Sequence, residues 1–211
     1  MIEPPRSAFL SLDGIDGTGK STQLRLLAER LRSLGYAVTT CTDPGGTELG
    51  AKLREILLFG KQQNTAMRAE ALLFMASRAE LVHRVIEPAL KRGEIVISDR
   101  FLLANVVYQG HAGGLNAEDL WSVGYFATGG VEPDLTIILD LPVGAARSRL
   151  SGQPDRLESR GADYFEKVRA GFLQEAAAQP QSRIVVDASP SLNAVHETIF
   201  AHVQRFLGAR P

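Results

Sequence analysis

Short runs of consecutive apolar residues alternate along the chain with longer stretches in which apolar residues recur every three or four positions. The short runs predict strands over 8–12, 37–41, 95–98, 135–139 and 183–186. The longer stretches predict helices over 21–34, 47–58, 66–91 and 193–207. Strands without polar alternation are buried on both faces, so this order predicts an α/β fold in which helices flank both faces of a five-stranded parallel sheet.

Length and composition favour a single domain that spans residues 1–211. Of the 211 residues, 45% are hydrophobic, which is enough for one sizeable core. The stretch 147–162 contains the turn-forming residues Ser151-Gly152-Gln153-Pro154, and we expect it to be a mobile lid within this domain. Lys and Arg number 23 against 24 Asp and Glu, so no excess of positive charge indicates a nucleic-acid polymer as a partner.

Two further features of the composition bear on where the protein works. No apolar run in the sequence reaches the length of a membrane-spanning helix, so we expect no membrane partner. Cys41 is the single cysteine and cannot form an internal disulfide. A lone cysteine is typical of a reducing compartment, and we therefore expect a cytoplasmic protein.

A phosphate-binding loop is the clearest chemical signal in the sequence. Residues 14–21 fit the pattern G-x-x-x-x-G-K-[ST], between a predicted strand and a predicted helix. In such a loop, backbone N–H groups and the positive end of the helix face the phosphates. We expect Lys20 to contact the β- and γ-phosphates of ATP and Ser21 to bind Mg²⁺. The predicted nucleotide-binding residues are Gly14, Ile15, Asp16, Gly17, Thr18, Gly19, Lys20, Ser21 and Thr22.

The dipeptide Asp99-Arg100 follows the third predicted strand directly. Ligands of open parallel sheets collect beyond the carboxyl ends of the strands, where the phosphate-binding loop also lies. At that position Asp99 could hold Mg²⁺ directly or through water, and Arg100 could bind a phosphate through two hydrogen bonds. Taken alone, the dipeptide is equally typical of a surface ion pair, but the loop beside it favours a ligand site.

Two groups of side chains have the spacing of a helix face. Phe74 and Arg78 are four residues apart. The second group, after the third strand, consists of Asn105, Tyr108 and Gln109. An aromatic ring with an amide and a guanidinium could stack on a nucleobase and contact its edge. The apolar neighbours of Phe74 favour a second interpretation, in which this ring packs in the hydrophobic core.

Four arginines cluster around the expected lid: Arg147, Arg149, Arg156 and Arg160. Arginines on a mobile segment can fold over transferring phosphates and neutralise developing charge. Runs of charge are usually solvated helix surface, and this interpretation suits Arg147 or Arg149 taken alone. Arg156, within Asp155-Arg156-Leu157-Glu158, is the more interesting member of this group.

In this order and spacing, the pieces resemble the thymidylate kinases, and the similarity covers most of the chain. The matching pieces are residues 12–23, Asp43-Pro44-Gly45-Gly46-Thr47, Lys52-Leu53-Arg54, Leu73-Phe74-Met75-Ala76-Ser77-Arg78, Ser98-Asp99-Arg100-Phe101, Tyr108-Gln109-Gly110, Pro133-Asp134-Leu135-Thr136 and Asp155-Arg156-Leu157-Glu158. The resemblance implies a P-loop nucleoside monophosphate kinase fold. It also implies transfer of the γ-phosphoryl group of ATP to dTMP, with Mg²⁺ as cofactor, giving dTDP and ADP. The family resemblance further suggests a homodimer.

The resemblance implies roles for the residues that bind the acceptor. Arg54 and Arg100 match arginines that hold the acceptor phosphate, and Asp16 matches an acid near the acceptor sugar. Phe74 matches a ring that stacks on thymine, which overrides the core interpretation, and Arg78 matches a residue that contacts the carbonyl edge of the base. The other expected acceptor-binding residues are Asp43, Asn105, Tyr108 and Gln109.

The catalytic and metal-binding residues follow from the same resemblance. Gly17 stands where some relatives have a catalytic arginine in the loop, so the sequence resembles kinases whose catalytic arginines come from the lid. The expected catalytic residues are Lys20, Arg100, Arg156, Asp16, Arg149 and Arg160. The expected ligands of Mg²⁺ are Ser21 and Asp99.

Two stretches depart from the family pattern and leave alternatives open. Thr42-Asp43 stands where the family commonly has Arg-Glu, and Phe101 and Ala104 replace a tyrosine and a serine. A kinase for another monophosphate, such as dUMP, is therefore one alternative. The other is a non-catalytic P-loop switch that binds GTP, because Asp43-Pro44-Gly45-Gly46 fits D-x-x-G. The sequence has no Asn-Lys-x-Asp element to bind guanine, however.

Overall fold

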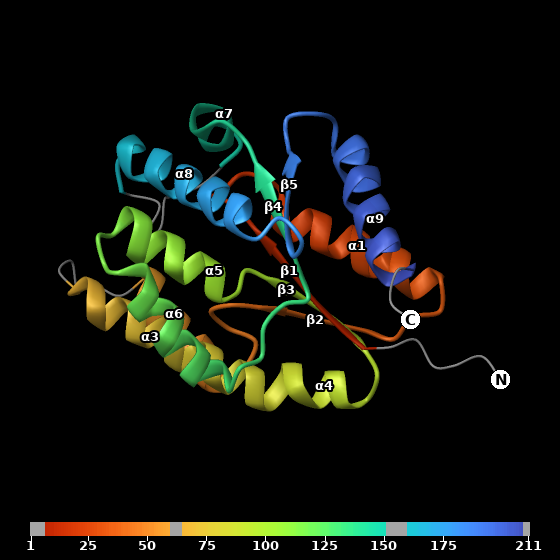
Figure 1. The fold of residues 1–211 in the computed structure, drawn as a ribbon, viewed down its shortest axis with the longest axis horizontal. Coiled ribbons are helices and arrows are strands. Elements are labelled where there is room, and N and C mark those ends of the chain that lie inside the picture. Colours follow the sequence, from red (N-terminus) through yellow and green to blue (C-terminus); the bar gives the residue numbers. More distant parts are fainter. Residues whose placement is uncertain (1–6, 60–64, 151–159, 209–211) are drawn as a thin grey trace.

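Parallel strands form the centre of the molecule (Figure 1). The computed structural model describes residues 7–59, 65–150 and 160–208. In this part of the chain there are five strands: β1 (Ala8–Asp13), β2 (Val38–Thr42), β3 (Ile95–Asp99), β4 (Leu135–Asp140) and β5 (Arg183–Asp187). Their order across the sheet is β2-β3-β1-β4-β5. The predicted strands are confirmed, and each extends by one polar residue beyond its predicted carboxyl end because that residue still belongs to the ladder.

Strand β1 lies in the middle of the sheet, between β3 and β4. Leu12 pairs with Asp99 of β3, and Leu10 pairs with Leu135 of β4. Every residue of β1 is buried, as its largely apolar sequence predicts for a central strand. The chain segments that follow β1 and β3 therefore leave the same edge of the sheet next to each other, which brings the phosphate-binding loop close to Asp99.

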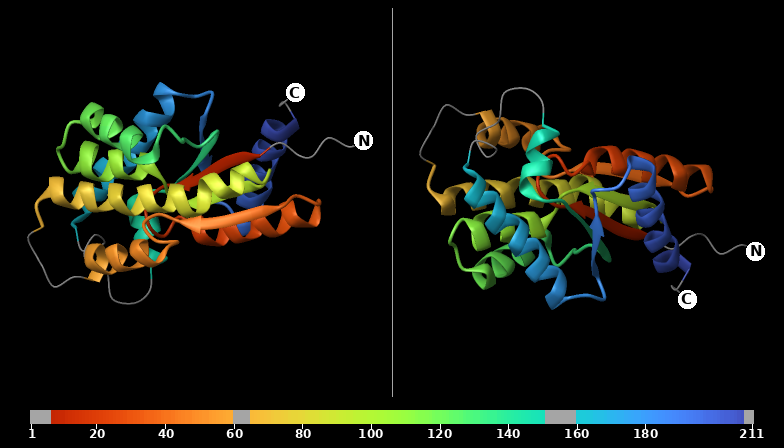
Figure 2. Two further views of the ribbon diagram at one scale, coloured as in Figure 1. Left: turned by 90° about the horizontal axis from the view of Figure 1, so that it is seen from below. Right: turned by 90° about the horizontal axis from the view of Figure 1, so that it is seen from above.

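Helices α1 (Lys20–Ser33) and α9 (Leu192–Gly208) lie side by side on one face of the sheet (Figures 1 and 2). The predicted helices over 21–34 and 193–207 are thereby confirmed. Leu27 of α1 and Ile199 of α9 are fully buried beneath them. Helix α1 begins at Lys20, within the phosphate-binding loop, so the first backbone N–H groups of the helix belong to the loop.

The opposite face is covered by helical segments from the middle of the chain and by α8 (Ala162–Ala178) (Figure 1). The predicted helix over 66–91 is confirmed as one helical run that contains a π-helical segment. This run comprises α3 (Met67–Leu81), the π-helical η1 (Val82–Ile86) and α4 (Glu87–Lys91). The predicted helix over 47–58 is observed as α2 (Glu48–Phe59), which packs against α3.

Three of the described helices have no counterpart among the predicted elements: α6 (Ala117–Thr128), α7 (Val143–Ser148) and α8. The helix face predicted for Asn105, Tyr108 and Gln109 lies on α5 (Leu102–Asn105) and the π-helical η2 (Val106–Ala112). Segments α5 and η2 follow each other without a break, so Asn105 and Gln109 lie about one turn apart, and their side chains are hydrogen-bonded. Helix α6 packs against α3, and α8 packs against η2.

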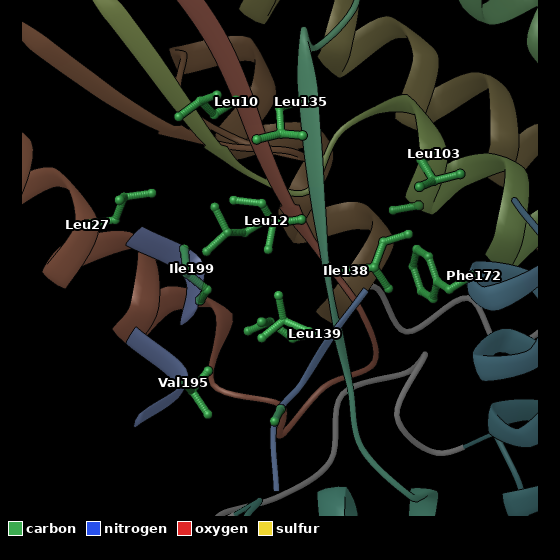
Figure 3. Packing of buried hydrophobic residues seen from close by; sticks show 14 of the residues in the cluster. Leu10, Leu12, Leu27, Leu103, Leu135, Ile138, Leu139, Phe172, Val195 and Ile199 are labelled. Atoms are coloured by element: carbon green, nitrogen blue, oxygen red, sulfur yellow. The ribbon is translucent and has the colours of Figure 1, made fainter. Parts of the chain in front are cut away.

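The main hydrophobic core has a part on each side of the central strands (Figure 3). Leu27 and Ile199 lie on the side of α1 and α9, whereas Leu103 and Phe172 lie on the other side of β4. Neighbouring residues of a strand point to opposite faces, and this alternation lets the apolar residues of β4 contribute to both parts. The core holds the central strands rigidly beneath the loops that follow their carboxyl ends.

Two expectations can be compared only with the part of the chain that the structure describes. Within the ranges 7–59, 65–150 and 160–208, no helix is long and apolar enough to cross a lipid bilayer. The expected lid over 147–162 is described only at its ends, where α7 and the start of α8 flank it. Ser151-Gly152-Gln153-Pro154 and Arg156 lie outside the described residues. The division into one domain with a lid stays a prediction.

Candidate active site

A cavity of about 640 Å³ opens beyond the carboxyl ends of β1, β2 and β3. Of the residues predicted for the site, those that line it are Asp16, Gly17, Thr18, Gly19, Lys20, Ser21, Thr22, Asp43, Arg54, Phe74, Arg78, Asp99, Arg100, Asn105, Tyr108, Gln109 and Arg149. Gly14 and Ile15, the first two residues of the loop, are buried, and their carbonyl oxygens accept hydrogen bonds from Arg100 and Lys20. The fold therefore gathers residues from widely separated stretches of the sequence in one place.

The phosphate-binding loop is held in shape by its own polar groups. The Thr18 hydroxyl donates to the carbonyl oxygen of Ile15 at 2.8 Å, and the Lys20 ammonium donates to the same oxygen at 2.9 Å. Gly17 has φ 86°, and a Cβ at this position would lie 2.1 Å from the carbonyl oxygen of Ala146 in α7. Only glycine fits there, so the loop is packed directly against the backbone of α7.

Lys20 is buried next to a carboxylate on the same loop. Its ammonium lies 3.6 Å from Oδ1 of Asp16. Burial lowers the pKa of Lys20, and the nearby Arg100 lowers it further, while Asp16 acts in the opposite direction. An additional anion such as a phosphate would stabilise the charged ammonium in this surrounding.

The Ser21 hydroxyl and the Asp99 carboxylate meet at the cavity wall. Ser21 Oγ donates to Asp99 Oδ2 at 2.6 Å, because α1 begins beside the carboxyl end of β3. A hydroxyl and a carboxylate are oxygen ligands of the kind that Mg²⁺ prefers, and Mg²⁺ usually takes its remaining ligands from phosphates and water. The residues present therefore fit the metal that the sequence predicts.

Arg100 connects the loop after β3 with the loop after β1. Its Nη2 donates to Asp16 Oδ1 at 2.6 Å, and its Nη1 donates to the carbonyl oxygen of Gly14 at 2.9 Å. Arg100 has a φ of 67°, an uncommon backbone conformation for a residue with a side chain. Burial raises the pKa of Asp16, but the charges of Arg100 and Lys20 outweigh burial and hold this pKa well below its usual range. Asp16 is therefore a fixed anion between two cations.

On the far side of Arg100, the ring of Tyr108 extends the cavity wall. The guanidinium carbon of Arg100 lies 5.0 Å from the centre of this ring. Burial raises the pKa of Tyr108 well above its usual range, so its phenol is neutral. Among the described residues, the buried Tyr108 hydroxyl and the buried Asp43 Oδ1 have no hydrogen-bond partner. Buried polar atoms normally have one, and both residues line the cavity.

Arg78 is a buried arginine whose guanidinium is shared between a carboxylate and an amide. Its Nε donates to Asp43 Oδ2 at 2.6 Å, and its Nη1 donates to Asn105 Oδ1 at 3.1 Å. Phe101 lies beneath this group, with its ring centre 5.6 Å from the guanidinium carbon. Arg78 is thus part of a buried ion pair and of the cavity wall at the same time.

The amides beyond Arg78 continue as a line of hydrogen bonds. Asn105 Nδ2 donates to Gln109 Oε1 at 2.7 Å, and Gln109 Nε2 donates to Glu70 Oε1 at 2.8 Å. Glu70, on α3, is fully buried and also accepts from Arg160 Nη2 at 2.9 and 2.7 Å. Glu70 was not predicted for the site, because its partners lie 39 and 90 residues away in the sequence.

The two interpretations of Phe74 each describe part of its surroundings. The ring packs with Leu57, Leu58 and Leu73 in a small apolar cluster, and it also lines the cavity. Arg54 is fixed by a hydrogen bond of 2.8 Å from its Nη1 to the carbonyl oxygen of Pro44. Phe74 and Arg54 therefore approach the cavity from α3 and α2, which pack against each other.

The predicted lid arginines occupy different positions. Arg149 lines the cavity and donates to the carbonyl oxygen of Ala188 at 3.1 Å. The guanidinium of Arg160 pairs with Glu70 and also donates to the Tyr164 hydroxyl at 2.6 Å. Arg160 is not among the residues that line the cavity, and Arg156 lies outside the described residues. The catalytic roles of all three arginines stay predictions.

An apolar part of the cavity wall was not predicted. Ala188 and Pro190, from the connection after β5, and Leu192 and Val195, from the start of α9, line the cavity near the phosphate-binding loop. The usable signal was topological, because the loop after the fifth strand leaves the same edge of the sheet as the other loops. Gln23 was missed too; its buried side chain donates to the carbonyl oxygen of Leu192 at 2.9 Å and so ties α1 to the start of α9.

Comparison with known proteins gives one consistent result. Residues 12–199 match the family model described as thymidylate kinase. A thymidylate kinase from Rhodopirellula baltica is 50% identical over 201 residues, covering 95% of this chain and 82% of that protein. One from Desulforudis audaxviator is 43% identical over 205 residues, covering 96% and 93%. A crystal structure of thymidylate kinase from Ehrlichia chaffeensis superposes with a TM-score of 0.80 at 30% identity, covering 95% of this chain and 100% of that one. The chain therefore belongs to the thymidylate kinase family.

Proposed function

We propose that this protein transfers the γ-phosphoryl group of ATP to dTMP and so forms ADP and dTDP. The observation that carries this function is one cavity that joins the phosphate-binding loop to Arg100 and to the side chains on α3 and the α5–η2 run. Relatives that are 50% and 43% identical to this chain carry the name thymidylate kinase. Residues that we assign to the ATP site and residues that we assign to the acceptor site line the same cavity.

Donor binding is assigned to the phosphate-binding loop. Its backbone N–H groups are fixed before ATP arrives, because Thr18 and Lys20 both hold the carbonyl oxygen of Ile15. Preorganised donors stabilise developing charge without rearranging during the reaction. Lys20 places a positive charge at the β- and γ-phosphates, and the apolar residues after β5 offer a surface to the remainder of the nucleotide.

Ser21 and Asp99 would hold Mg²⁺, on the strength of their 2.6 Å contact. When bound, the ion neutralises phosphate charge. The protein contributes two oxygen ligands at the meeting point of α1 and β3, and Lys20 and Arg100 supply further positive charge nearby.

Acceptor binding is assigned to the opposite part of the cavity. Arg100 and Arg54 bind the phosphate of dTMP, and Asp16 lies near its sugar. Phe74 stacks on the base, while Arg78, Asn105, Tyr108, Gln109 and Asp43 surround it. The neutral phenol of Tyr108 and the unpaired oxygen of Asp43 are polar groups that this ligand can satisfy.

The reaction needs no covalent nucleophile from the protein. The acceptor phosphate oxygen is already anionic at neutral pH, so catalysis consists of alignment and charge neutralisation. We assign this neutralisation to Lys20 and Arg100, with Arg149, Arg156 and Arg160 as further candidates. Arg156 is the leading candidate of these three, and Arg149 lines the cavity.

A coupled assay of ADP release across the common nucleoside monophosphates tests this function. We expect dTMP to be the best acceptor and activity to require both ATP and Mg²⁺. The panel should include dUMP and dCMP, which differ from dTMP in the base. No ADP release with any acceptor would contradict the proposed activity, and faster release with a different monophosphate would contradict the assigned substrate.

We also propose that the protein is a cytoplasmic homodimer. Phe126 on α6 is 89% exposed, and Leu72 on the neighbouring α3 is half exposed. Large exposed apolar side chains that gather on one face often mark a contact with another protein. Cys41 is a free thiol, and a single cysteine without a disulfide partner is typical of a reducing compartment. Sedimentation of the wild type and of Phe126→Glu tests the dimer: the variant should sediment as a smaller species, and identical sedimentation would exclude this face.

A further inference from the structure

A fully buried carboxylate ends the line of hydrogen bonds that leads away from the acceptor part of the cavity. Glu70 accepts from Gln109 through Oε1, and it accepts from Arg160 through both oxygens. Both carboxylate oxygens accept from the cationic guanidinium of Arg160, and a carboxylate can only accept hydrogen bonds. Glu70 therefore requires Gln109 to turn its NH₂ group toward α3.

The other end of the line, at Arg78, requires an acceptor where Glu70 requires a donor. The guanidinium of Arg78 can only donate, and its Nη1 lies 3.1 Å from Asn105 Oδ1. Between the two ends, Asn105 Nδ2 donates to Gln109 Oε1 at 2.7 Å. Each hydrogen bond of this line thus runs in one direction, from Arg78 to Glu70, and both amides have their oxygen toward Arg78 and their nitrogen toward Glu70.

We propose that Glu70 is a positioning residue for base recognition, because it fixes the direction in which the Gln109 and Asn105 amides face. This inference rests on the proposed function. A carboxamide has nearly the same shape after a half turn, but its donor and acceptor change places. Without a fixed end, the same cavity would offer two opposite hydrogen-bond patterns to a base.

The fixed direction selects one class of base. Arg78 and Asn105 both line the cavity, so a donor lies beside the acceptor oxygen of the amide. Thymine has a carbonyl acceptor next to an N–H donor on its pairing edge, which complements this arrangement. Cytosine has an amino donor next to a ring-nitrogen acceptor, which opposes it. The line of hydrogen bonds that ends at Glu70 therefore favours bases whose pairing edge has a carbonyl acceptor next to an N–H donor, as thymine does.

The variant Glu70→Gln tests this inference with almost no change in volume. Arg160 lies closest to Oε2, at 2.7 Å, so the amide oxygen of the variant should stay at that position. Its NH₂ group then faces Gln109 Nε2, and donor meets donor. We expect the ratio of kcat/KM for dTMP to that for dCMP to fall roughly tenfold or more, as is usual when a buried hydrogen-bonding group loses its partner.

The double variant Glu70→Gln/Gln109→Glu is the rescue. The carboxylate moves one position along the line, where it accepts from the new amide at position 70 and from Asn105 Nδ2, so Asn105 keeps its direction. We expect most of the dTMP preference to return. Glu80→Gln is the matched control, because Glu80 is on the same helix and pairs with Arg84 at the surface; its ratio should equal that of the wild type.

Each outcome decides the question. An unchanged ratio in folded Glu70→Gln overturns the inference while leaving the proposed function intact. If Glu70→Gln does not fold, the double variant decides: a restored ratio supports the inference and a lost ratio overturns it. If neither variant folds, Glu70 is a structural residue, and the inference is overturned as well. A wild type that is inactive with every monophosphate overturns the proposed function first and this inference with it.

Discussion

Arg100 Nη2 and Asp16 Oδ1 lie 2.6 Å apart and join the two loops between which a phosphoryl group would pass. Asp16 belongs to the loop after β1, and Arg100 follows β3, which pairs with β1. The same guanidinium also holds the Gly14 carbonyl oxygen. The arginine that we assign to the acceptor phosphate is therefore positioned by the loop that we assign to ATP.

Replacing Arg100 by Ala should weaken dTMP binding more than ATP binding. Losing a charged hydrogen-bonding partner costs about 1.5–3 kcal/mol, which corresponds to roughly 10- to 150-fold in affinity. Separate calorimetric titrations with dTMP and with a non-hydrolysable ATP analogue measure the two effects. Arg25→Ala, which removes an exposed arginine of α1, is the control. A larger loss for the ATP analogue would reverse the assignment of the two sites.

Lys20→Ala should fold and lose most phosphoryl transfer. Its ammonium is the buried cation of the phosphate-binding loop, and removing one preorganised group of this kind typically lowers kcat by about 10²–10³. Initial rates at saturating ATP and Mg²⁺ test this, with circular dichroism as the check on folding. Lys52→Ala removes an exposed lysine and should leave the rate unchanged. Turnover close to the wild type in Lys20→Ala would remove the loop from the mechanism.

The buried pair of Arg78 and Asp43 predicts an effect on stability as well as on specificity. Arg78→Ala leaves the Asp43 carboxylate buried without its partner, which typically destabilises a protein by about 3–5 kcal/mol. Arg78→Ala/Asp43→Ala removes both charges and should be less destabilised than Arg78→Ala, as urea unfolding can measure. The folded fraction of Arg78→Ala should also show a smaller dTMP-to-dCMP ratio. If that ratio is unchanged, Arg78 serves the ion pair alone.

Asp13 predicts a pH dependence of stability. Burial raises its pKa from the ordinary value of 3.8 to about 6, although the Ser11 hydroxyl and nearby cations oppose this. Between these values the folded protein keeps a proton that the unfolded chain has released, so stability falls as the pH rises through this window. The loss reaches about 3 kcal/mol above pH 6.

Asparagine at position 13 has no carboxyl group that can ionise. The free energy of unfolding of Asp13→Asn should therefore increase relative to that of the wild type as the pH rises from about 4 to about 6. Urea unfolding of both proteins without nucleotide or Mg²⁺, at several pH values across this range, measures the difference. Asp163→Asn, at the exposed start of α8, is the control for a carboxylate outside the site. A constant difference between Asp13→Asn and the wild type at all pH values would show that Asp13 does not titrate in this range.

The strands and the phosphate-binding loop could be predicted because their signals are local. A central strand such as β1 is mostly apolar, and the glycine pattern sits directly behind it. Helix α6 lacks such a signal: the buried residues Leu120, Gly124 and Thr128 include only one large apolar side chain. Its caps were the usable signal, since Asn116 accepts from the N–H groups of the first turn and Gly129 ends the helix in the left-handed region.

The side-chain partners within the site could not be predicted in the same way. Phe74 was expected either in the core or on the cavity wall, and the structure shows that one ring contributes to both. Spacing along a helix places Arg78 on a face but does not say that Asp43, 35 residues earlier, neutralises it. Glu70 has no motif of its own, and its importance follows only from the fold that brings Gln109 and Arg160 to it.

The central place of β1 has a consequence for the order in which the protein matures during synthesis. Residues 8–13 leave the ribosome before their hydrogen-bonding partners 95–99 and 135–138, which are made much later. At about 5–20 residues per second, β1 waits roughly 6–25 s for β4. During this time a largely apolar strand lacks at least one neighbour, and the loop behind it has no rigid support. The segment that we assign to ATP binding is therefore translated early but completed late, so nascent chains that end before β4 should be unable to retain ATP and should depend on chaperones for solubility.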